Sequence, residues 1–288
     1  MSKKNPEYDF KWCPGCGDFG VRRAIEAVLQ KRLTEKEEPI ENTVIVAGIG
    51  CSGNLVHLLE GPQPYGFHGI HGRTLPVSFG IKNANPKLNV LIVAGDGDFL
   101  SIGMEHIAPQ AARNLDVTAI IMDNGVYGLT KGQSSPTSKS GEITSSTPYG
   151  KIEKQINPLE IYLSLGVSFI ASAFSGKIKQ LTNIIEEAIE HPGFSIINVQ
   201  SPCTTYNNTY EQLKGSKAKN IAPIIQDIPA DHDVTNKQAS YNLINQETIP
   251  LGTLYKSVEK PFTEKFNNMV ENNTTQNSAA KLLESYKI

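Results

Sequence analysis

Four short apolar runs, each ending at glycine or polar residues, most constrain the fold of this chain. They are TVIVAGI (43–49), LNVLIVA (88–94), VTAIIM (117–122) and FSIINV (194–199). Runs this continuously apolar are typical of strands that are buried on both faces of a parallel sheet. We expect helices at 18–33, 101–114 and 177–190, a helix opening at Asn157-Pro158, and a further strand near 167–171. The alternation predicts an α/β fold with a doubly wound, mostly parallel sheet.

The apolar pattern fades after Cys203, and this sets the expected domain boundary. Residues 1–203 are predicted to form one α/β domain. Residues 204–288 are rich in Asn, Thr, Lys, Gln and Glu, so we expect an extended arm or peripheral helices that pack on the core or on a partner subunit. At the helix starts, Asp18 is a predicted N-cap and Pro158 a predicted first helical residue.

The bulk composition excludes several classes of function. A formal net charge of −2 gives no basic patch for nucleic acid or for an anionic membrane. No apolar run reaches the 18 or so residues that a membrane span needs. No apolar stretch follows the N-terminal lysines, so we expect no signal peptide and a cytoplasmic location.

Two polar motifs follow neighbouring predicted strands and predict a metal–diphosphate site. Gly95-Asp96-Gly97-Asp98 follows LNVLIVA, and Asp123-Asn124-Gly125-Val126 follows VTAIIM. Ligands of such folds bind at the carboxyl ends of the strands. Carboxylate and amide oxygens suit Mg²⁺, which is usually shared with phosphate oxygens. Each motif alone reads as an ordinary turn, but the pair resembles the Gly-Asp-Gly…Asn signature of thiamine-diphosphate enzymes.

That signature implies roles for individual residues. Asp96, Asn124 and the backbone carbonyl of Val126 would bind Mg²⁺. Gly97 and Asp98 would lie against the diphosphate, although Asp98 could also cap the helix that follows.

The four cysteines predict a second site. Cys13 and Cys16 are two positions apart on a loop, whereas Cys51 and Cys203 follow predicted strands. The three segments could converge on the edge that carries the metal–diphosphate motifs. Four thiolates suit a structural zinc or a [4Fe–4S] cluster. The alternative is that Cys51 and Cys203 are buried, inert thiols.

Taken together, the motifs resemble the β subunit of 2-oxoacid:ferredoxin oxidoreductases, from about residue 8 to residue 210. The relatives concerned are two-subunit bacterial and archaeal enzymes acting on 2-oxoglutarate or on a range of 2-oxoacids. The resemblance implies the diphosphate-binding domain of thiamine enzymes, with an N-terminal cysteine loop and a C-terminal arm. The matching phrases are WCPGCGDFG (12–20), GIGCSG (48–53), HGRTLP (71–76), GDGD (95–98), MDNGVYGLTKGQ (122–133) and SPC (201–203).

The resemblance also assigns site residues. It makes all four cysteines the ligands of one [4Fe–4S] cluster: Cys13, Cys16, Cys51 and Cys203. It lines the thiamine with two turns and a glycine–leucine pair: Ile49, Gly50, Cys51, Ser52, His71, Gly72, Arg73, Gly128 and Leu129. Leu129 would prop the cofactor in its bent shape, Lys131 would lie near the substrate carboxylate, and His71 is a candidate catalytic residue or only a turn cap.

The implied activity is the coenzyme A-dependent oxidative decarboxylation of a 2-oxoacid to acyl-CoA and CO₂, with single electrons passing through the cluster to ferredoxin. A larger α subunit would bind the aminopyrimidine end of thiamine, so we expect a heterodimer or a doubled heterodimer. Several relatives have Lys or Arg two or three residues after the cysteine that matches Cys51, but this chain has Gly53 and Asn54. The substrate therefore stays open among 2-oxoglutarate, pyruvate or several 2-oxoacids.

Two alternatives belong to other classes. One is a subunit of a non-oxidative thiamine-dependent decarboxylase with a structural Cys₄ zinc site. The other is a binding subunit that keeps the fold without turnover, which the intact Asp96–Asn124 pair and the four cysteines disfavour.

Overall fold

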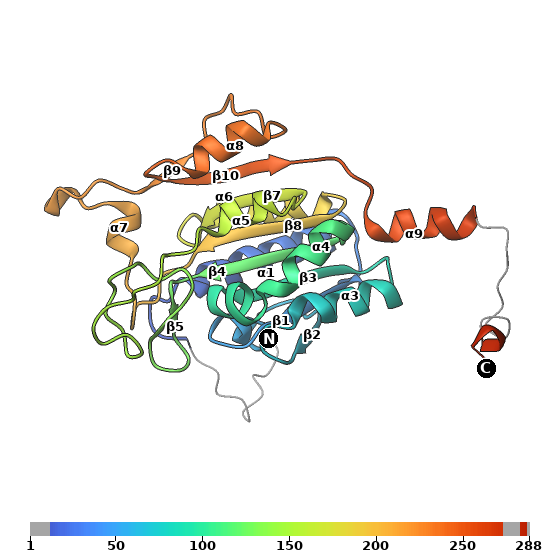
Figure 1. The fold of residues 1–288 in the computed structure, drawn as a ribbon, viewed down its shortest axis with the longest axis horizontal. Helices are drawn as coiled ribbons and strands as arrows, with labels where there is room; N and C mark the ends of the chain where they lie inside the picture. Colours follow the sequence, from blue (N-terminus) through green and yellow to red (C-terminus); the bar gives the residue numbers. More distant parts are fainter. Residues whose placement is uncertain (1–11, 273–282, 287–288) are drawn as a thin grey trace.

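An eight-stranded sheet forms the centre of the computed structural model, which describes residues 12–272 and 283–286 (Figure 1). Residues 8–11 of the family resemblance, and 273–282 and 287–288 of the C-terminal extension, lie outside it. Within the described ranges, no helix is long and apolar enough to cross a membrane.

The predicted apolar runs all form strands. The strand order is β2-β1-β3-β4-β8-β7-β10-β9, and the first six strands pair in parallel. The predicted α/β fold with a mostly parallel sheet is confirmed. The parallel strands are β1 (Thr43–Ala47), β2 (Tyr65–His68), β3 (Asn89–Gly95), β4 (Val117–Asp123), β7 (Phe169–Phe174) and β8 (Phe194–Gln200).

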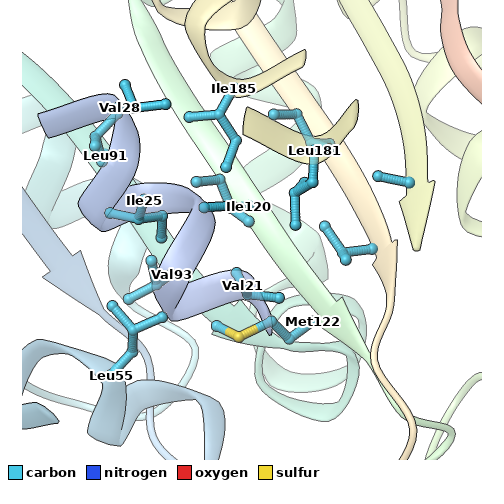
Figure 2. Close-up of a cluster of buried hydrophobic side chains, with 14 of the residues drawn as sticks. Val21, Ile25, Val28, Leu55, Leu91, Val93, Ile120, Met122, Leu181 and Ile185 are labelled. Carbon is cyan, nitrogen blue, oxygen red and sulfur yellow. The ribbon is translucent and has the colours of Figure 1, made fainter. Parts of the chain in front are cut away.

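Helices cover both faces of the sheet. Because successive strand side chains point to opposite faces, neighbours such as Leu91 and Ile92 belong to different cores. Helices α1 (Asp18–Glu35) and α6 (Ile178–Glu190) cover the face of Leu91, where Ile25 and Ile185 join the cluster (Figure 2). The opposite core lies under α3 (Thr74–Ala84), α4 (Ile107–Arg113) and α5 (Pro158–Ser164).

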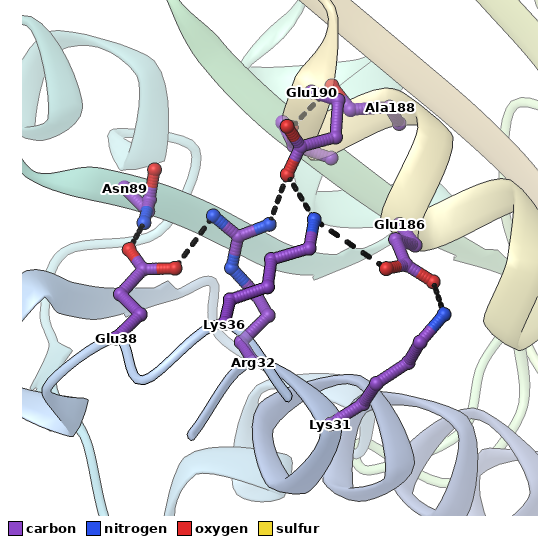
Figure 3. A network of polar contacts seen from close by, with 9 residues as sticks. Lys31, Arg32, Lys36, Glu38, Asn89, Glu186, Ala188 and Glu190 are labelled. Carbon is purple, nitrogen blue, oxygen red and sulfur yellow. Dashed lines mark hydrogen bonds and ion pairs between the residues drawn. The ribbon is translucent and has the colours of Figure 1, made fainter. Parts of the chain in front are cut away.

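Ion pairs link α1 to α6, the two helices that cover the core of Leu91 (Figure 3). Lys31 lies 2.6 Å from Glu186, and Lys36 lies 2.7 Å from Glu190. Arg32, whose side chain is largely buried, also contacts Glu190. An isolated surface ion pair contributes at most about 1 kcal/mol to the free energy of unfolding. Here, however, the pairs form a network, because Glu190 contacts both Arg32 and Lys36. It helps to hold α1, which begins directly after the cysteine loop.

The helix starts are partly as predicted. Pro158 is the first residue of α5, as expected. The prediction that Asp18 caps α1 is wrong, because Gly17 takes the N-cap position and the Asp18 carboxylate makes no capping bond. Residues 101–114 do not form one regular helix. A π-helical turn (Asp98–Ile102), a 3₁₀ turn (Met104–His106) and α4 follow one another, and the Gly103 N–H closes the π turn on the Asp98 carbonyl at 3.0 Å.

The C-terminal region adds strands that the sequence analysis missed. Strand β10 (Ile249–Lys256) pairs antiparallel with β7, and β9 (Ile225–Asp227) lies parallel to β10. Leu251 and Leu254 of β10 are fully buried, so this part of the chain contributes to the core. The apolar pattern was too weak to predict a strand because β10 lies near the sheet edge and Gly252 and Thr253 separate its leucines.

The remaining elements are short or peripheral. They are α2 (Leu55–Leu58), β5 (Val126–Tyr127), β6 (Gln133–Ser134), α7 (Tyr210–Lys214), α8 (Lys237–Ile244), α9 (Phe262–Glu271), and 3₁₀ turns at Ile40–Asn42, Ser52–Asn54 and Lys217–Lys219.

The buried position of Leu254 gives a test of this arrangement. We expect Leu254→Ala to lower the free energy of unfolding by about 2–5 kcal/mol, because the side chain is fully buried and its removal leaves a cavity. Val258→Ala is the control, since Val258 is 93% exposed and should change stability by less than about 0.5 kcal/mol. Urea unfolding followed by circular dichroism measures both. Equal midpoints for the two variants would contradict the assignment of β10 to the core.

Candidate active site

The predicted motifs meet at one edge of the sheet. Parallel registers place Ala47 beside Val93, Gly95 beside Met122, and Asp123 beside Gln200. The segments that follow these strand ends therefore lie side by side. They are the turn at 48–54, the Gly-Asp-Gly-Asp turn at 95–98, the turn at 123–127 and the Ser-Pro-Cys segment at 201–203.

Asp96 and Asn124 lie together, as their motifs predicted. The backbone N–H of Asn124 donates to Asp96 Oδ1 at 3.4 Å, and the Asp96 side chain is almost fully buried. Asn124 Oδ1 accepts the N–H of Val126 at 3.0 Å, so the third predicted ligand residue belongs to the same turn. Gly125 between them has φ +66°, a conformation that favours glycine.

A second carboxylate, missed by the sequence analysis, lies behind Asp96. The Thr137 hydroxyl lies 2.7 Å from Asp96 Oδ2 and 2.8 Å from Asp123 Oδ1. One hydroxyl has a single proton to donate, so two buried carboxylates share one donor. Burial raises the pKa of both, and the Asp123 charge raises that of Asp96 further. A divalent cation at Asp96 would offset this repulsion, and the oxygen donors present fit Mg²⁺.

A buried lysine holds the loop that carries Thr137. Lys151 Nζ donates to the carbonyl oxygens of Ser135 at 2.9 Å, Pro136 at 3.1 Å and Ser138 at 3.0 Å. These bonds use all three ammonium protons. No sequence signal pointed to Thr137 or Lys151, because their roles come from a loop that folds back across the strand ends.

Asp98 joins three segments of the site. Its Oδ1 accepts the N–H of Ile49 at 2.9 Å, the N–H of Gly72 at 2.8 Å and the His71 ring nitrogen Nδ1 at 2.5 Å. Its buried Oδ2 has no hydrogen-bond partner among the described residues and faces Gly48, where a Cβ would lie only 2.3 Å away. The carboxylate therefore fixes both predicted thiamine-lining turns and orients the half-exposed His71 ring. It makes no helix-capping bond, so the alternative cap role is not found.

The glycines and Arg73 of the predicted site have specific packing reasons. A Cβ at Gly97 would lie 2.3 Å from the Tyr127 ring, whose hydroxyl donates to the Gly97 carbonyl at 3.0 Å. Gly72 has φ +69° and packs on Ile102, and the Arg73 guanidinium donates to the Ile102 carbonyl at 2.9 Å.

A short hairpin carries the remaining predicted residues. Strands β5 and β6 enclose Leu129, whose side chain is 52% exposed, and Lys131, which is exposed with φ +83°. A left-handed non-glycine residue is strained, and such strain clusters at functional sites. Gly128 lies next to the cysteines: its Cβ would be 3.5 Å from Cys51 Sγ and 3.8 Å from Cys203 Sγ.

The structure brings the three segments that carry the four cysteines together. The Trp12 indole N–H donates to the Cys51 carbonyl at 2.8 Å, and the Gly17 N–H donates to the Pro202 carbonyl at 3.0 Å. Burial, the Asp18 charge and the neighbouring thiols of Cys203 and Cys13 raise the pKa of Cys51 to about 11.

Cys16 is affected in the same way. Burial is the largest cause of its raised pKa, followed by the charge of Asp18, and the thiols of Cys203 and Cys51 add to it. Even so, across 12–272 and 283–286 no three His, Cys, Asp or Glu side chains are arranged to hold a metal ion. The predicted cysteine site is thus supported by the hydrogen bonds that bring its three segments together, whereas the four sulfur atoms do not surround a common point.

A cavity of about 660 Å³ lies beside Asn124 and Asp123. The ends of β4 and β8 form one wall, with Asn124, Asn198 and Gln200, and the 244–250 segment forms another. Its size is that of a small-molecule site.

Comparisons with known proteins agree with this architecture. Residues 48–199 match the family described as "Thiamine pyrophosphate enzyme, C-terminal TPP binding domain". The chain is 38% identical to the 2-oxoacid:ferredoxin oxidoreductase subunit beta of Saccharolobus solfataricus, over 85% of this chain and 81% of that protein. It is 36% identical to a 2-oxoglutarate synthase subunit of Archaeoglobus fulgidus, over 68% of this chain and 70% of that one.

A solved structure is similar over almost the whole length. It is a 2-oxoglutarate:ferredoxin oxidoreductase from Magnetococcus marinus with 2-oxoglutarate, coenzyme A and succinyl-CoA bound. The TM-score is 0.84 at 33% sequence identity, covering 98% of this chain and 94% of that chain. The fold, the strand-end motifs and these relatives agree, and the chain belongs to the β subunits of 2-oxoacid:ferredoxin oxidoreductases.

Proposed function

We propose that Asp96, Asn124 and the Val126 carbonyl hold Mg²⁺, and through it the diphosphate of thiamine diphosphate. The carrying observation is the buried Asp96 carboxylate beside the Asn124–Val126 turn, at the edge where parallel strands end. Crowding with Asp123 favours a cation here. Thiamine diphosphate supplies the carbanion chemistry of decarboxylation, whereas the protein positions the reactants.

The chain's own residues would position the cofactor. Asp98 fixes the turns of Ile49 and Gly72, which we propose line the thiazolium together with Gly50, Ser52 and Arg73. The Asp98 carboxylate accepts from His71 Nδ1, which leaves Nε2 for contact with ligand. Direct contact of Gly97 and Asp98 with the diphosphate stays a prediction.

The four cysteines are proposed to bind one [4Fe–4S] cluster. Supporting this, three segments bring four unpaired thiols together, and the missing side chain at Gly128 leaves room beside Cys51 and Cys203. Cluster binding requires thiolates, so it would release the protons that the raised thiol pKa values retain. With coenzyme A and ferredoxin as co-substrates, the activity is oxidative decarboxylation of a 2-oxoacid to acyl-CoA and CO₂.

Gly53, two residues after Cys51, bears on substrate choice. A Cβ at Gly53 would lie 1.6 Å from the Gly48 carbonyl oxygen, so this turn has no space for a lysine or arginine there. Lys131, on the hairpin with Leu129, is the cation that we propose near the substrate carboxylate, and its strained backbone supports a functional role. Leu129, exposed beside it, is proposed to support the cofactor. We infer a range of 2-oxoacids that includes pyruvate and 2-oxoglutarate.

An α subunit would complete the site. β subunits of this family imply such a partner, and we propose that it covers the turn of His71 and supplies the aminopyrimidine-binding domain. Ile70 is 77% exposed and Ile102 is 46% exposed, and both contact this turn. Exposed apolar groups beside a ligand site favour a protein partner. The cytoplasmic location and the doubled heterodimer stay predictions.

The magnesium assignment predicts the effect of removing one hydroxyl. Thr137→Val should weaken Mg²⁺-dependent binding of thiamine diphosphate about 10–100-fold, because it removes the bond that orients Asp96. Asp96→Asn should weaken binding at least as much. Calorimetric titration of the assembled complex measures both. Thr118→Val is the matched control, a buried threonine at the opposite end of β4 whose hydroxyl donates to the Ala188 carbonyl at 3.1 Å. Wild-type affinity in Thr137→Val would refute the role of Thr137.

The overall activity is tested by anaerobic co-expression with the α subunit. We expect about four irons per β subunit, a brown colour bleached by dithionite, and coenzyme A-dependent dye reduction with pyruvate, 2-oxobutyrate and 2-oxoglutarate. A colourless protein with one zinc and no iron would instead favour the non-oxidative decarboxylase. Full activity without the α subunit would contradict the proposed division of the site.

The interface proposal predicts a defect confined to assembly. Ile70→Glu should reduce α-subunit binding about tenfold or more, while the unfolding temperature of the β chain stays unchanged because the side chain is already exposed. Val258→Glu is the control: Val258 is also exposed, at 93%, but follows β10 at the edge where β7 begins, away from the site. Co-purification and size-exclusion chromatography compare them. Equal α-subunit binding by both variants would rule out this surface.

A further inference from the structure

Asp18 is a buried carboxylate with no part in the proposed chemistry. Its side chain is almost completely buried at the start of α1. The Ser201 hydroxyl donates to Oδ1 at 2.6 Å, and the Ser52 hydroxyl donates to Oδ2 at 3.3 Å. Burying an ionisable group without such partners would be costly. A surface position would have avoided this cost, so the buried site needs a reason.

The three residues that meet here come from the three cysteine-bearing segments. Asp18 follows Cys16 by two positions, Ser52 follows Cys51 directly, and Ser201 precedes Cys203 by two. One carboxylate therefore joins the loop, the 48–54 turn and the strand end through side-chain bonds. Other hydrogen bonds join the segments in pairs: the Gly17 N–H to the Pro202 carbonyl, the Thr204 hydroxyl to the Pro14 carbonyl at 3.0 Å, and the Trp12 indole to the Cys51 carbonyl.

The turn of Cys51 is held from its other side as well. Asp98 accepts the N–H of Ile49 at 2.9 Å, while Asp18 accepts the hydroxyl of Ser52 at 3.3 Å. Cys51 lies between these two anchored residues. Its position is thereby fixed relative to both the diphosphate side and the other cysteines. Loss of either carboxylate would free one end of the turn.

We propose that Asp18 is a positioning residue for the cysteine set, which it locks by joining all three cysteine-bearing segments. This rests on the proposed [4Fe–4S] site. Partners outside the ligand shell orient the ligands of a metal site and typically change its affinity 10–100-fold. The spectrum of a cluster depends on ligand geometry and on bonds near its sulfurs. Asp18 touches no reacting group, so its effect must pass through the cysteines.

Three variants distinguish the effect of the Asp18 side chain's shape from the effect of its hydrogen bonds to the serines. Asp18→Ala removes both serine contacts, Asp18→Asn keeps the shape without the charge, and Ser201→Ala removes one contact. The matched control is Ser195→Ala, a fully buried serine at the start of β8 whose hydroxyl bonds the Ala188 carbonyl at 2.9 Å. All are prepared anaerobically as the α/β complex. Iron content, the electron paramagnetic resonance spectrum of the reduced cluster and iron release to a chelator are measured.

We expect Asp18→Ala to release iron about tenfold faster or more, with an altered resonance spectrum. Ser201→Ala and Asp18→Asn should shift the spectrum in smaller steps, while Ser195→Ala matches wild type. If Asp18→Ala fails to fold, the other two variants decide the outcome. Iron-loaded variants whose spectra and iron release match Ser195→Ala would overturn the role of Asp18, while the cluster itself would stand. A wild-type complex without iron would overturn the proposed function, and this inference with it.

Discussion

Parallel pairing of β1, β3, β4 and β8 is the constraint on which the site depends. Because these strands run in the same direction, their carboxyl ends, and the turns that follow, meet at one edge. Residues separated by most of the chain, from the cysteine loop to Cys203, are thereby brought together. The helices and the two cores mainly keep these strands in register.

That edge is rich in buried carboxylates. Asp18, Asp96, Asp98 and Asp123 are all less than one-tenth exposed. Serine hydroxyls donate to Asp18, and backbone N–H groups and a histidine donate to Asp98. Asp96 and Asp123 share the Thr137 hydroxyl, to which the Asn124 N–H adds for Asp96 and the Asn198 amide for Asp123. Two of them, Asp18 and Asp98, order backbone turns, whereas the Asp96–Asp123 pair concentrates negative charge where a cation would bind. At the same edge of the sheet, some carboxylates therefore hold the turns in place, whereas others are placed to bind a cation.

The sequence predicts much of the fold and most of the residue types that make up the candidate active site. Continuous apolar runs occur only where both sheet faces are covered, so β1, β3, β4 and β8 were predictable. Strand β10 was not, because it lies near the sheet edge and its two leucines are separated by Gly252 and Thr253, which breaks the apolar run. The motifs around Asp96, Asn124 and the cysteines could be recognised in the sequence, because they are short runs that contain metal-ligand residue types. Thr137 and Lys151 could not, because a single threonine or lysine in a loop belongs to no recognisable motif.

The sequence by itself determined the α/β class, the strand-end motifs and the family of the chain, because periodicity and short motifs are local properties. Only the tertiary structure decided what the buried polar groups do. It moved Asp18 from a helix cap to a link between three segments, turned Asp98 toward Ile49, Gly72 and His71, and closed position 53 to a side chain. These outcomes depend on which distant donors and atoms a side chain meets, and that is fixed only when the sheet and its turns are assembled.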